Sequence, residues 1–203
     1  MTRTRTAILI SGGGSNMEAL IKASQSDPDY PAEIVLVISN RPKAAGLTKA
    51  ASLGIPAVAI DHKDYDSRED FEAEMQRQLI SHNVDFICCA GFMRVLTGQF
   101  VSNWAGRMIN IHPSLLPKYK GLNTHARAIA AREPWHGASV HYVTADLDSG
   151  SVITQIRVKV DDDDTPESLS QKVRAQEHNL YIRALKFALL DFTPRDPSTS
   201  DKR

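Results

Sequence analysis

Asn110 and His112 lie two residues apart at the end of a short apolar segment, residues 108–111. The segment has the character of a buried strand, and successive side chains of a strand alternate between its two faces. Both polar side chains should therefore point to one side, where they can face one substrate together. An amide can donate a hydrogen bond to a developing oxyanion, and an imidazole can move protons near neutral pH.

A carboxylate from a later turn can complete this set. The next predicted strand, residues 139–143, runs into the acidic turn 146–150, whose sequence is Asp-Leu-Asp-Ser-Gly. We expect this turn to bring Asp148 back to His112, where a carboxylate stabilises the charged imidazolium. With an amide, an imidazole and a carboxylate, there is no obvious need for a metal or a covalent nucleophile.

A glycine-rich loop near the N-terminus predicts an anion site. Residues 11–16, Ser-Gly-Gly-Gly-Ser-Asn, separate a predicted buried strand at residues 7–10 from a helical pattern. Because no Cβ stands in the way, the backbone around Gly14 and the helix N-terminus can face a phosphate, while Ser15 and Asn16 can cap the helix or bind an oxygen. The alternative, that the glycines only make a tight turn, also fits this pattern.

A nicotinamide-binding loop fits the same segment less well. The third glycine of a dinucleotide fingerprint would fall at Met17. The second predicted strand, residues 34–38, also ends in Ser39-Asn40 rather than in an acid that could bind a ribose hydroxyl. The loop therefore matches a phosphate on a small molecule better than a nicotinamide dinucleotide.

The elements that must position these residues alternate along the chain. Strands are expected at residues 7–10, 34–38, 57–60, 86–90, 108–111, 139–143 and 152–160. Helices are expected to follow residue 16 and at residues 42–53, 66–82, 97–104, 124–131 and 165–190. Thr97 should cap one helix, Thr165-Pro166 should start the last, and Ser67 with Asp70 has the spacing of a capping box. This order predicts an α/β domain with a mostly parallel sheet.

The composition excludes several classes of partner. The 203 residues hold 24 Lys and Arg against 24 Asp and Glu, so no net charge favours nucleic acid or an acidic membrane. No run of about eighteen apolar residues predicts a membrane span. Alternation sends the adjacent Cys88 and Cys89 to opposite faces of a buried strand, which fits a reducing compartment, and we expect a cytoplasmic protein. Residues 191–203, rich in Pro, Ser, Asp and Arg, are predicted to form a disordered tail.

Three further histidines, His125, His136 and His141, lack the spacing of a helical pair and a carboxylate partner, so the sequence does not support a metal set. We interpret His136 and His141 as loop and strand-end hydrogen-bonding groups rather than catalysts. The acidic run 161–164 lacks the alternating ligands, central glycine and final glutamate of a calcium loop. A solvated acidic turn is the better interpretation.

The order Asn110-x-His112-Pro-Ser-Leu-Leu-Pro-Lys, with a later Leu-Asp-x-Gly at residues 147–150 and Gln155, closely resembles the folate-dependent formyltransferases. The resemblance covers residues 7–190 and is strongest to members that act on phosphoribosylglycinamide (GAR) in purine synthesis. It implies a single Rossmann-like formyltransferase domain at residues 1–190, with a mostly parallel twisted sheet and helices on both faces. It also implies 10-formyltetrahydrofolate as co-substrate, no metal, no nucleic acid or membrane partner, and leaves a homodimer open.

In the reaction that this resemblance implies, the GAR amine attacks the formyl carbon, and Asn110 with protonated His112 binds the tetrahedral oxyanion. Asp148 would favour the imidazolium and hold a water that carries the proton from the amine to the folate nitrogen. The two substrates would hold each other in place, which is a large part of catalysis when two molecules must meet.

The resemblance also implies which residues contact each substrate. The phosphate of GAR would bind Gly14, Ser15 and Asn16, and the rest of GAR would contact Met93, Pro113, Arg174, Ala175, Gln176 and Glu177. The folate would contact Arg68, Met93, Arg94, Val95, Leu96, Asn110, Thr144, Ala145, Asp146, Leu147 and Asp148. Arg68 would meet the glutamate tail of the folate. The chain departs from the family at Lys120, Asn123 and Ser149, which puts the shape of these loops in question but not the chemistry.

Other functions would need only some of these predicted residues and binding sites. Hydrolysis of formyltetrahydrofolate needs the same three residues, with water in place of the amine, but no phosphate loop. Transfer to initiator methionyl-tRNA would want a further basic domain, and this chain is neutral overall. A non-catalytic folate or phosphosugar sensor would keep the pockets but would have no use for Asn110, His112 and Asp148.

Overall fold

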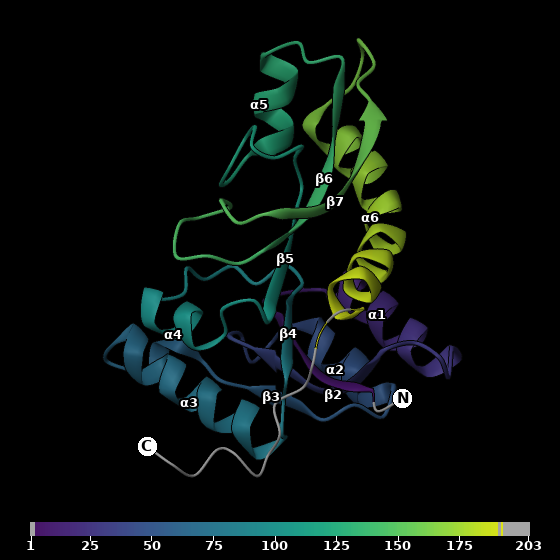
Figure 1. The fold of residues 1–203 in the computed structure, drawn as a ribbon. Coiled ribbons are helices and arrows are strands. Elements are labelled where there is room, and N and C mark those ends of the chain that lie inside the picture. Colours follow the sequence, from purple (N-terminus) through teal and green to yellow (C-terminus); the bar gives the residue numbers. More distant parts are fainter. Residues whose placement is uncertain (1–2, 191, 193–203) are drawn as a thin grey trace.

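A seven-stranded sheet in the order β3-β2-β1-β4-β5-β6-β7 forms the centre of the computed structural model, which describes residues 3–190 and 192 (Figure 1). The strands are β1 Thr4–Ile10, β2 Ala32–Ser39, β3 Ala57–Ala59, β4 Phe86–Cys89, β5 Met108–His112, β6 Trp135–Tyr142 and β7 Val152–Lys159. Neighbouring strands are parallel from β3 to β5, whereas β6 and β7 are antiparallel to their neighbours. The predicted fold class is confirmed, and each predicted strand is present with its ends shifted by a few residues.

Helices connect the strands and begin where the sequence signals them. They are α1 Ser15–Ser26, α2 Ala45–Ser52, the short 3-10 helix η1 His62–Asp64, α3 Arg68–Ser81, α4 Gly98–Asn103, α5 Thr124–Ala130 and α6 Pro166–Leu189. Thr97 caps α4, and Thr165 with Ser168 forms a complete capping box at α6. At α3 only half of the predicted box forms, because Ser67 accepts from the Asp70 amide while the Asp70 carboxylate accepts from the Ser67 hydroxyl rather than from its backbone.

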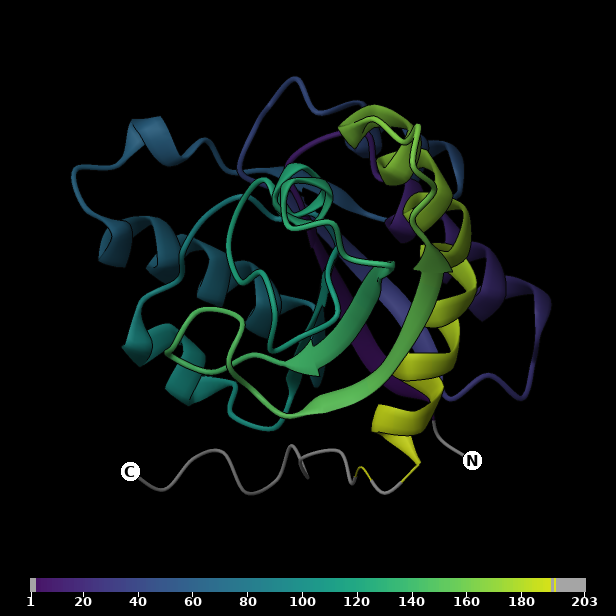
Figure 2. The same ribbon diagram turned by 90° about the horizontal axis from the view of Figure 1, so that it is seen from above.

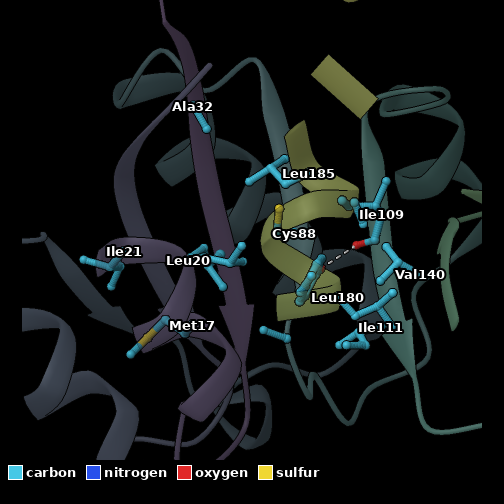
Figure 3. Packing of buried hydrophobic residues seen from close by; sticks show 14 of the residues in the cluster. Met17, Leu20, Ile21, Ala32, Cys88, Ile109, Ile111, Val140, Leu180 and Leu185 are labelled. Carbon is cyan, nitrogen blue, oxygen red and sulfur yellow. Dashed lines mark hydrogen bonds between the residues drawn. The ribbon is translucent and has the colours of Figure 1, made fainter. Parts of the chain in front are cut away.

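Two hydrophobic cores lie on the two faces of the sheet. The first packs α1, α2 and α6 against it, and Figure 3 shows Leu20 of α1, Leu185 of α6 and Ile109 of β5 among its side chains. The second packs α3 and α4 on the other face, and Figure 2 shows α6 and α3 on opposite sides of the strands. Cys88 belongs to the first core and Cys89 to the second, as alternation predicts. Both thiols are free, and burial raises the pKa of Cys89 to about 12.

The strand order places the loops after β1 and β4 next to each other at the carboxyl edge of the sheet. The chain passes from β1 outward to β2 and β3, then returns to the other side of β1 for β4 and β5. The loops after β1 and β4 therefore leave neighbouring strands in opposite directions. In open α/β sheets this arrangement creates a crevice at the carboxyl ends of the strands, where ligands bind.

In the described residues no helix has both the length and the apolar character needed to cross a membrane. Most of the predicted tail, residue 191 and residues 193–203, lies outside the described part of the chain. The ring of Phe192 is described and packs edge to face with the ring of Phe86, with 5.5 Å between their centroids. The domain boundary at residue 190 stays a prediction.

Candidate active site

A cavity of about 580 Å³ lies at the carboxyl ends of β4 and β5. Its walls come from the segments that follow these strands, from the loop between β6 and β7, and from one face of α6. Asn110, His112 and Asp148 all line it, so the structure brings together the three groups that the sequence singled out. A cavity of this size is in the range of pockets that bind small molecules, so it can hold the reacting parts of its substrates.

His112 and Asp148 face each other inside this cavity. The imidazole is 6% exposed and the aspartate 8%, and His112 Nδ1 lies 3.4 Å from Asp148 Oδ2. The other ring nitrogen, Nε2, lies 2.9 Å from the carbonyl oxygen of Tyr119. Both partners are acceptors, so each ring nitrogen can interact with its partner as a donor only when it carries a hydrogen. The contact with Tyr119 has no signal in the sequence, because it depends on how the loop after β5 folds back.

The turn that carries Asp148 is fixed by its backbone. Asp148 adopts a left-handed conformation with φ 48°, and the amide of Gly121 donates to its Oδ2 at 2.9 Å. Gly150 is required two residues later, since a Cβ there would lie 1.8 Å from the carbonyl oxygen of Tyr142. Burial alone raises the pKa of Asp148, but hydrogen bonds from His141 and Gly121 and the nearby His112 outweigh burial, and the net pKa is lowered. The carboxylate is therefore charged at neutral pH.

His141 belongs to the same cluster. It is a hydrogen-bonding group near the end of β6, as interpreted from the sequence, but the expectation that it lacks a carboxylate partner is wrong. Its Nε2 lies 3.3 Å from Asn110 Nδ2 and 3.5 Å from Asp148 Oδ1. Its Nδ1 lies 2.8 Å from the carbonyl oxygen of Tyr142. The residue reaches Asn110 because the two are paired directly across β5 and β6, and side chains of such a pair share one face. Only the antiparallel register reveals this neighbour.

Two of the three departures from the family pattern contact each other. Lys120 Nζ donates to Ser149 Oγ at 2.7 Å, so the loops that carry Gly121 and Asp148 are joined at their tips. The third departure, Asn123, takes a left-handed φ of 56° before α5, a conformation that asparagine tolerates. These side chains therefore fit the loops in which they lie.

The glycine loop after β1 leaves its backbone exposed directly before α1. Gly12 and Gly13 are exposed, and Gly14 has φ +70° at the start of α1. A Cβ on Gly14 would lie 3.0 Å from the Cα of Gly46, whose amide donates to the carbonyl oxygen of Gly12. The helix makes no side-chain cap, so the capping role offered for Ser15 and Asn16 is wrong.

Asn16 instead turns toward α6. Its Nδ2 donates to Glu177 Oε2 at 2.9 Å, and its buried Oδ1 has no partner within the described residues. Both residues line the cavity, as do Arg174 and Pro113. Of the remaining residues assigned to the GAR site by resemblance, Gly14, Ser15, Ala175 and Gln176 do not line this cavity.

The predicted folate segment forms one wall of the cavity. Met93 and Val95 are 56% and 58% exposed, large values for apolar side chains that line a pocket. Arg94, Leu96, Thr144, Ala145 and Leu147 also line it, whereas Asp146 and Arg68 do not. Arg68 is the first residue of α3 and is exposed, which leaves it free to meet a ligand that extends out of the cavity.

The remaining charged candidates have structural partners. His125, which also lines the cavity, has its Nδ1 3.1 Å from His136 Nε2, and burial lowers the pKa of both rings, that of His136 to about 4. No group of metal-ligating side chains occurs in the described part of the chain. In the acidic turn 161–164, Asp161 and Asp164 both accept from Lys172 at 2.7 Å. That turn is closed by an ion pair and is not merely solvated.

Comparison with known proteins finds formyl transferases and purine biosynthetic proteins. A protein-family model described as formyl transferase matches residues 4–185. The trifunctional purine biosynthetic protein adenosine-3 of Drosophila melanogaster is 49% identical over 184 residues, which are 90% of this chain but 14% of that protein. The phosphoribosylglycinamide formyltransferase of Escherichia coli is 42% identical over 86% of this chain and 82% of its own. The crystal structure of phosphoribosylglycinamide formyltransferase from Brucella melitensis superposes with a TM-score of 0.89 at 45% identity, covering 96% of this chain and 100% of that one.

Proposed function

The chain belongs to the formyl transferase family, and from this premise we propose that it transfers the formyl group of 10-formyltetrahydrofolate to the amine of GAR. The observation that carries the proposal is the shared cavity. It holds the cluster of Asn110, His112 and Asp148 and also reaches Asn16, which follows the glycine loop. The relatives named phosphoribosylglycinamide formyltransferase support the choice of acceptor. The other activities of the trifunctional relatives are not part of the proposal.

GAR would enter from the side of the glycine loop. Its phosphate fits the exposed backbone of Gly12 to Gly14, where the N-terminus of α1 favours an anion. Asn16 and Glu177 lie on the route from there to Asn110, and the unpaired Oδ1 of Asn16 can accept a hydrogen bond from the ligand. The folate would lie between the wall formed by Met93 to Leu96 and the loop that carries Asp148.

In the reaction, the lone pair of the GAR amine forms a C–N bond to the formyl carbon, and the carbonyl oxygen becomes an oxyanion. Asn110 Nδ2 would donate to that oxygen, and the buried cation of His112 would stabilise its charge. Direct donation from His112 Nε2 requires the formyl oxygen to take the place of the Tyr119 carbonyl.

The proton must then leave the attacking nitrogen. Asp148 lies beside His112 and at the cavity wall, where it would hold a water that takes this proton and returns it to the folate nitrogen. As that nitrogen is protonated, its bond to the former formyl carbon breaks. The products are formylated GAR and tetrahydrofolate, and atoms and charge balance without a further reactant.

One assay with three acceptors tests the proposal. The protein is mixed with 10-formyltetrahydrofolate and with GAR, with water alone or with initiator methionyl-tRNA, and release of tetrahydrofolate is followed. Turnover that depends on GAR supports the proposal. Equal turnover in water would indicate a hydrolase, turnover only with tRNA would indicate a different acceptor, and binding without turnover would indicate a sensor.

A further inference from the structure

Ser11 occupies a buried position between two loops. It follows directly on β1, which lies between β2 and β4 in the sheet, so the loops that leave these two strands flank it. Ser11 is 3% exposed, and Asn40, the first residue after β2, is 1% exposed. The order of the strands therefore gives one small side chain access to both loops.

The hydroxyl of Ser11 both accepts and donates a hydrogen bond. It accepts from the backbone amide of Met93 at 2.7 Å and donates to Asn40 Oδ1 at 2.5 Å. The backbone amide of Ser11 donates to the carbonyl oxygen of Gly91 at 3.1 Å, so two separate bonds tie it to the loop after β4. Asn40 continues the network, because its Nδ2 lies 3.2 Å from His62 Nδ1.

These bonds join the two sites to which the proposed function assigns the substrates. Gly12 to Gly14, the phosphate cradle, come directly after Ser11 in the chain. Met93 is the first residue of the exposed apolar wall that would hold the folate, and it lines the cavity with Gly91. A shift of the cradle that moves Ser11 must therefore move or break the partly buried hydrogen bond to the Met93 amide, and the buried Ser11 hydroxyl would then lose a partner, which is unfavourable.

Resting on the proposed function, we propose that Ser11 is a positioning residue that couples the GAR and folate sites. Phosphate bound at residues 12–14 holds Ser11 in place, and Ser11 then holds the amide of Met93 where the folate wall is complete. By thermodynamic linkage the effect is reciprocal, so the folate also tightens the binding of GAR.

The coupling can be measured without chemistry by using tetrahydrofolate, which has no formyl group to transfer. Calorimetry gives the dissociation constant of tetrahydrofolate alone and with saturating GAR, and the reverse titration checks reciprocity. In the unaltered protein, each ligand should tighten the other about fivefold or more. In Ser11→Ala, which adds no bulk but leaves the Met93 amide and the Asn40 oxygen unbonded, the coupling should fall to within about twofold of none.

Ser24→Ala is the matched control. The Ser24 hydroxyl is also buried, at 4% exposure, and Ser24 does not line the cavity. Its hydroxyl donates to the carbonyl oxygen of Ala32 and accepts from Arg3 and from the amide of Ile34. This variant should lose these hydrogen bonds and keep the full coupling. Ser11→Cys, which keeps the shape but bonds more weakly, should show an intermediate coupling and decides the matter if Ser11→Ala does not fold.

Three results would overturn the proposal: no coupling in the unaltered protein, unchanged coupling in Ser11→Ala or Ser11→Cys, or an equal loss in Ser24→Ala. If the unaltered protein transfers the formyl group to GAR and one of these results is found, only the role of Ser11 fails. If it binds neither ligand, the proposed function fails as well.

Discussion

The parallel and antiparallel parts of the sheet build their share of the cavity in different ways. After β1, the proposed phosphate site is the exposed backbone around Gly12 and Gly13, and after β4 apolar side chains such as Met93 line the cavity, with the buried hydroxyl of Ser11 joining the two loops. Beside β5 and β6, the cavity wall consists of side chains from distant positions, Asn110, His112, His141 and Asp148, brought together by strand pairing. The loops there also contain left-handed residues such as Tyr119.

Under the proposed function, this difference separates phosphate binding from chemistry. Backbone amides at a helix N-terminus bind a phosphate with little dependence on neighbouring side chains, provided that no Cβ blocks the approach. A reacting centre needs particular functional groups at particular distances, so the loss of one side chain affects the rate more than the affinity. Substitutions in the two parts should therefore have opposite signatures.

The largest effect is expected at His112. His112→Ala should lower turnover about 10²- to 10⁴-fold, with little change in the binding of either substrate, because it removes a group proposed to stabilise the oxyanion. Turnover and both Michaelis constants of the variant test this. A double variant with Asp148→Asn should be barely worse than His112→Ala alone, since residues that act as a unit lose activity non-additively. Additive losses would mean that Asp148 acts apart from His112.

Gly14→Val should produce the opposite signature. Its left-handed φ and the 3.0 Å approach of the Gly46 Cα leave no room for a side chain, so the cradle must shift. We expect GAR to bind about tenfold or more weakly, while tetrahydrofolate alone binds as before. Separate calorimetric titrations of each ligand measure both quantities. An equal loss for both ligands would contradict a phosphate site here.

Gly150→Ala is the corresponding glycine substitution in the turn between β6 and β7. A Cβ at this position would collide with the carbonyl oxygen of Tyr142, so the turn that carries Asp148 must move. Turnover should fall about tenfold, because small misplacement of a reacting group is costly, and GAR binding should be retained. Single-turnover rates beside GAR titrations would show the split. Weaker GAR binding at unchanged turnover would reverse the assignment of the two ends.

A smaller effect is expected at Arg68, outside the cavity. Arg68→Ala should raise the Michaelis constant of the folate about three- to tenfold with turnover nearly unchanged, as for an interaction equally strong in the ground and transition states. Steady-state kinetics with each substrate varied in turn distinguish the sites. If the constant for GAR moves instead, Arg68 belongs to the other ligand.

The smallest effect at neutral pH is expected at His136, in the antiparallel strand β6. Its pKa of about 4 in the folded protein lies below the ordinary value of 6.5, so protonation favours unfolding. Stability should fall as the pH drops below 6.5 and level off near pH 4, by on the order of 1–3 kcal/mol. Urea unfolding at pH 7 and pH 4.5 should show a smaller loss in His136→Gln. Equal losses in both proteins would place the acid sensitivity elsewhere.

Local patterns in the sequence predicted what depends on neighbouring residues. Period-two alternation placed Asn110 and His112 on one side of a strand and sent Cys88 and Cys89 to different cores. The glycine run after the first strand predicted a turn into a helix, and threonines marked the starts of α4 and α6. These features are fixed by backbone geometry over a few residues, so a single sequence suffices to find them.

Contacts between distant segments were decided only by the tertiary structure. His141 meets Asn110 because β6 runs antiparallel in one particular register, and a shift of one residue would turn it to the other face. The carbonyl of Tyr119 reaches His112 because a loop of left-handed residues folds back over the strand end. Ser11 joins two loops because β1 lies between β2 and β4, a consequence of strand order that no local pattern encodes. The sequence thus determined the chemical groups and their local faces, while strand order and register decided which of them act together.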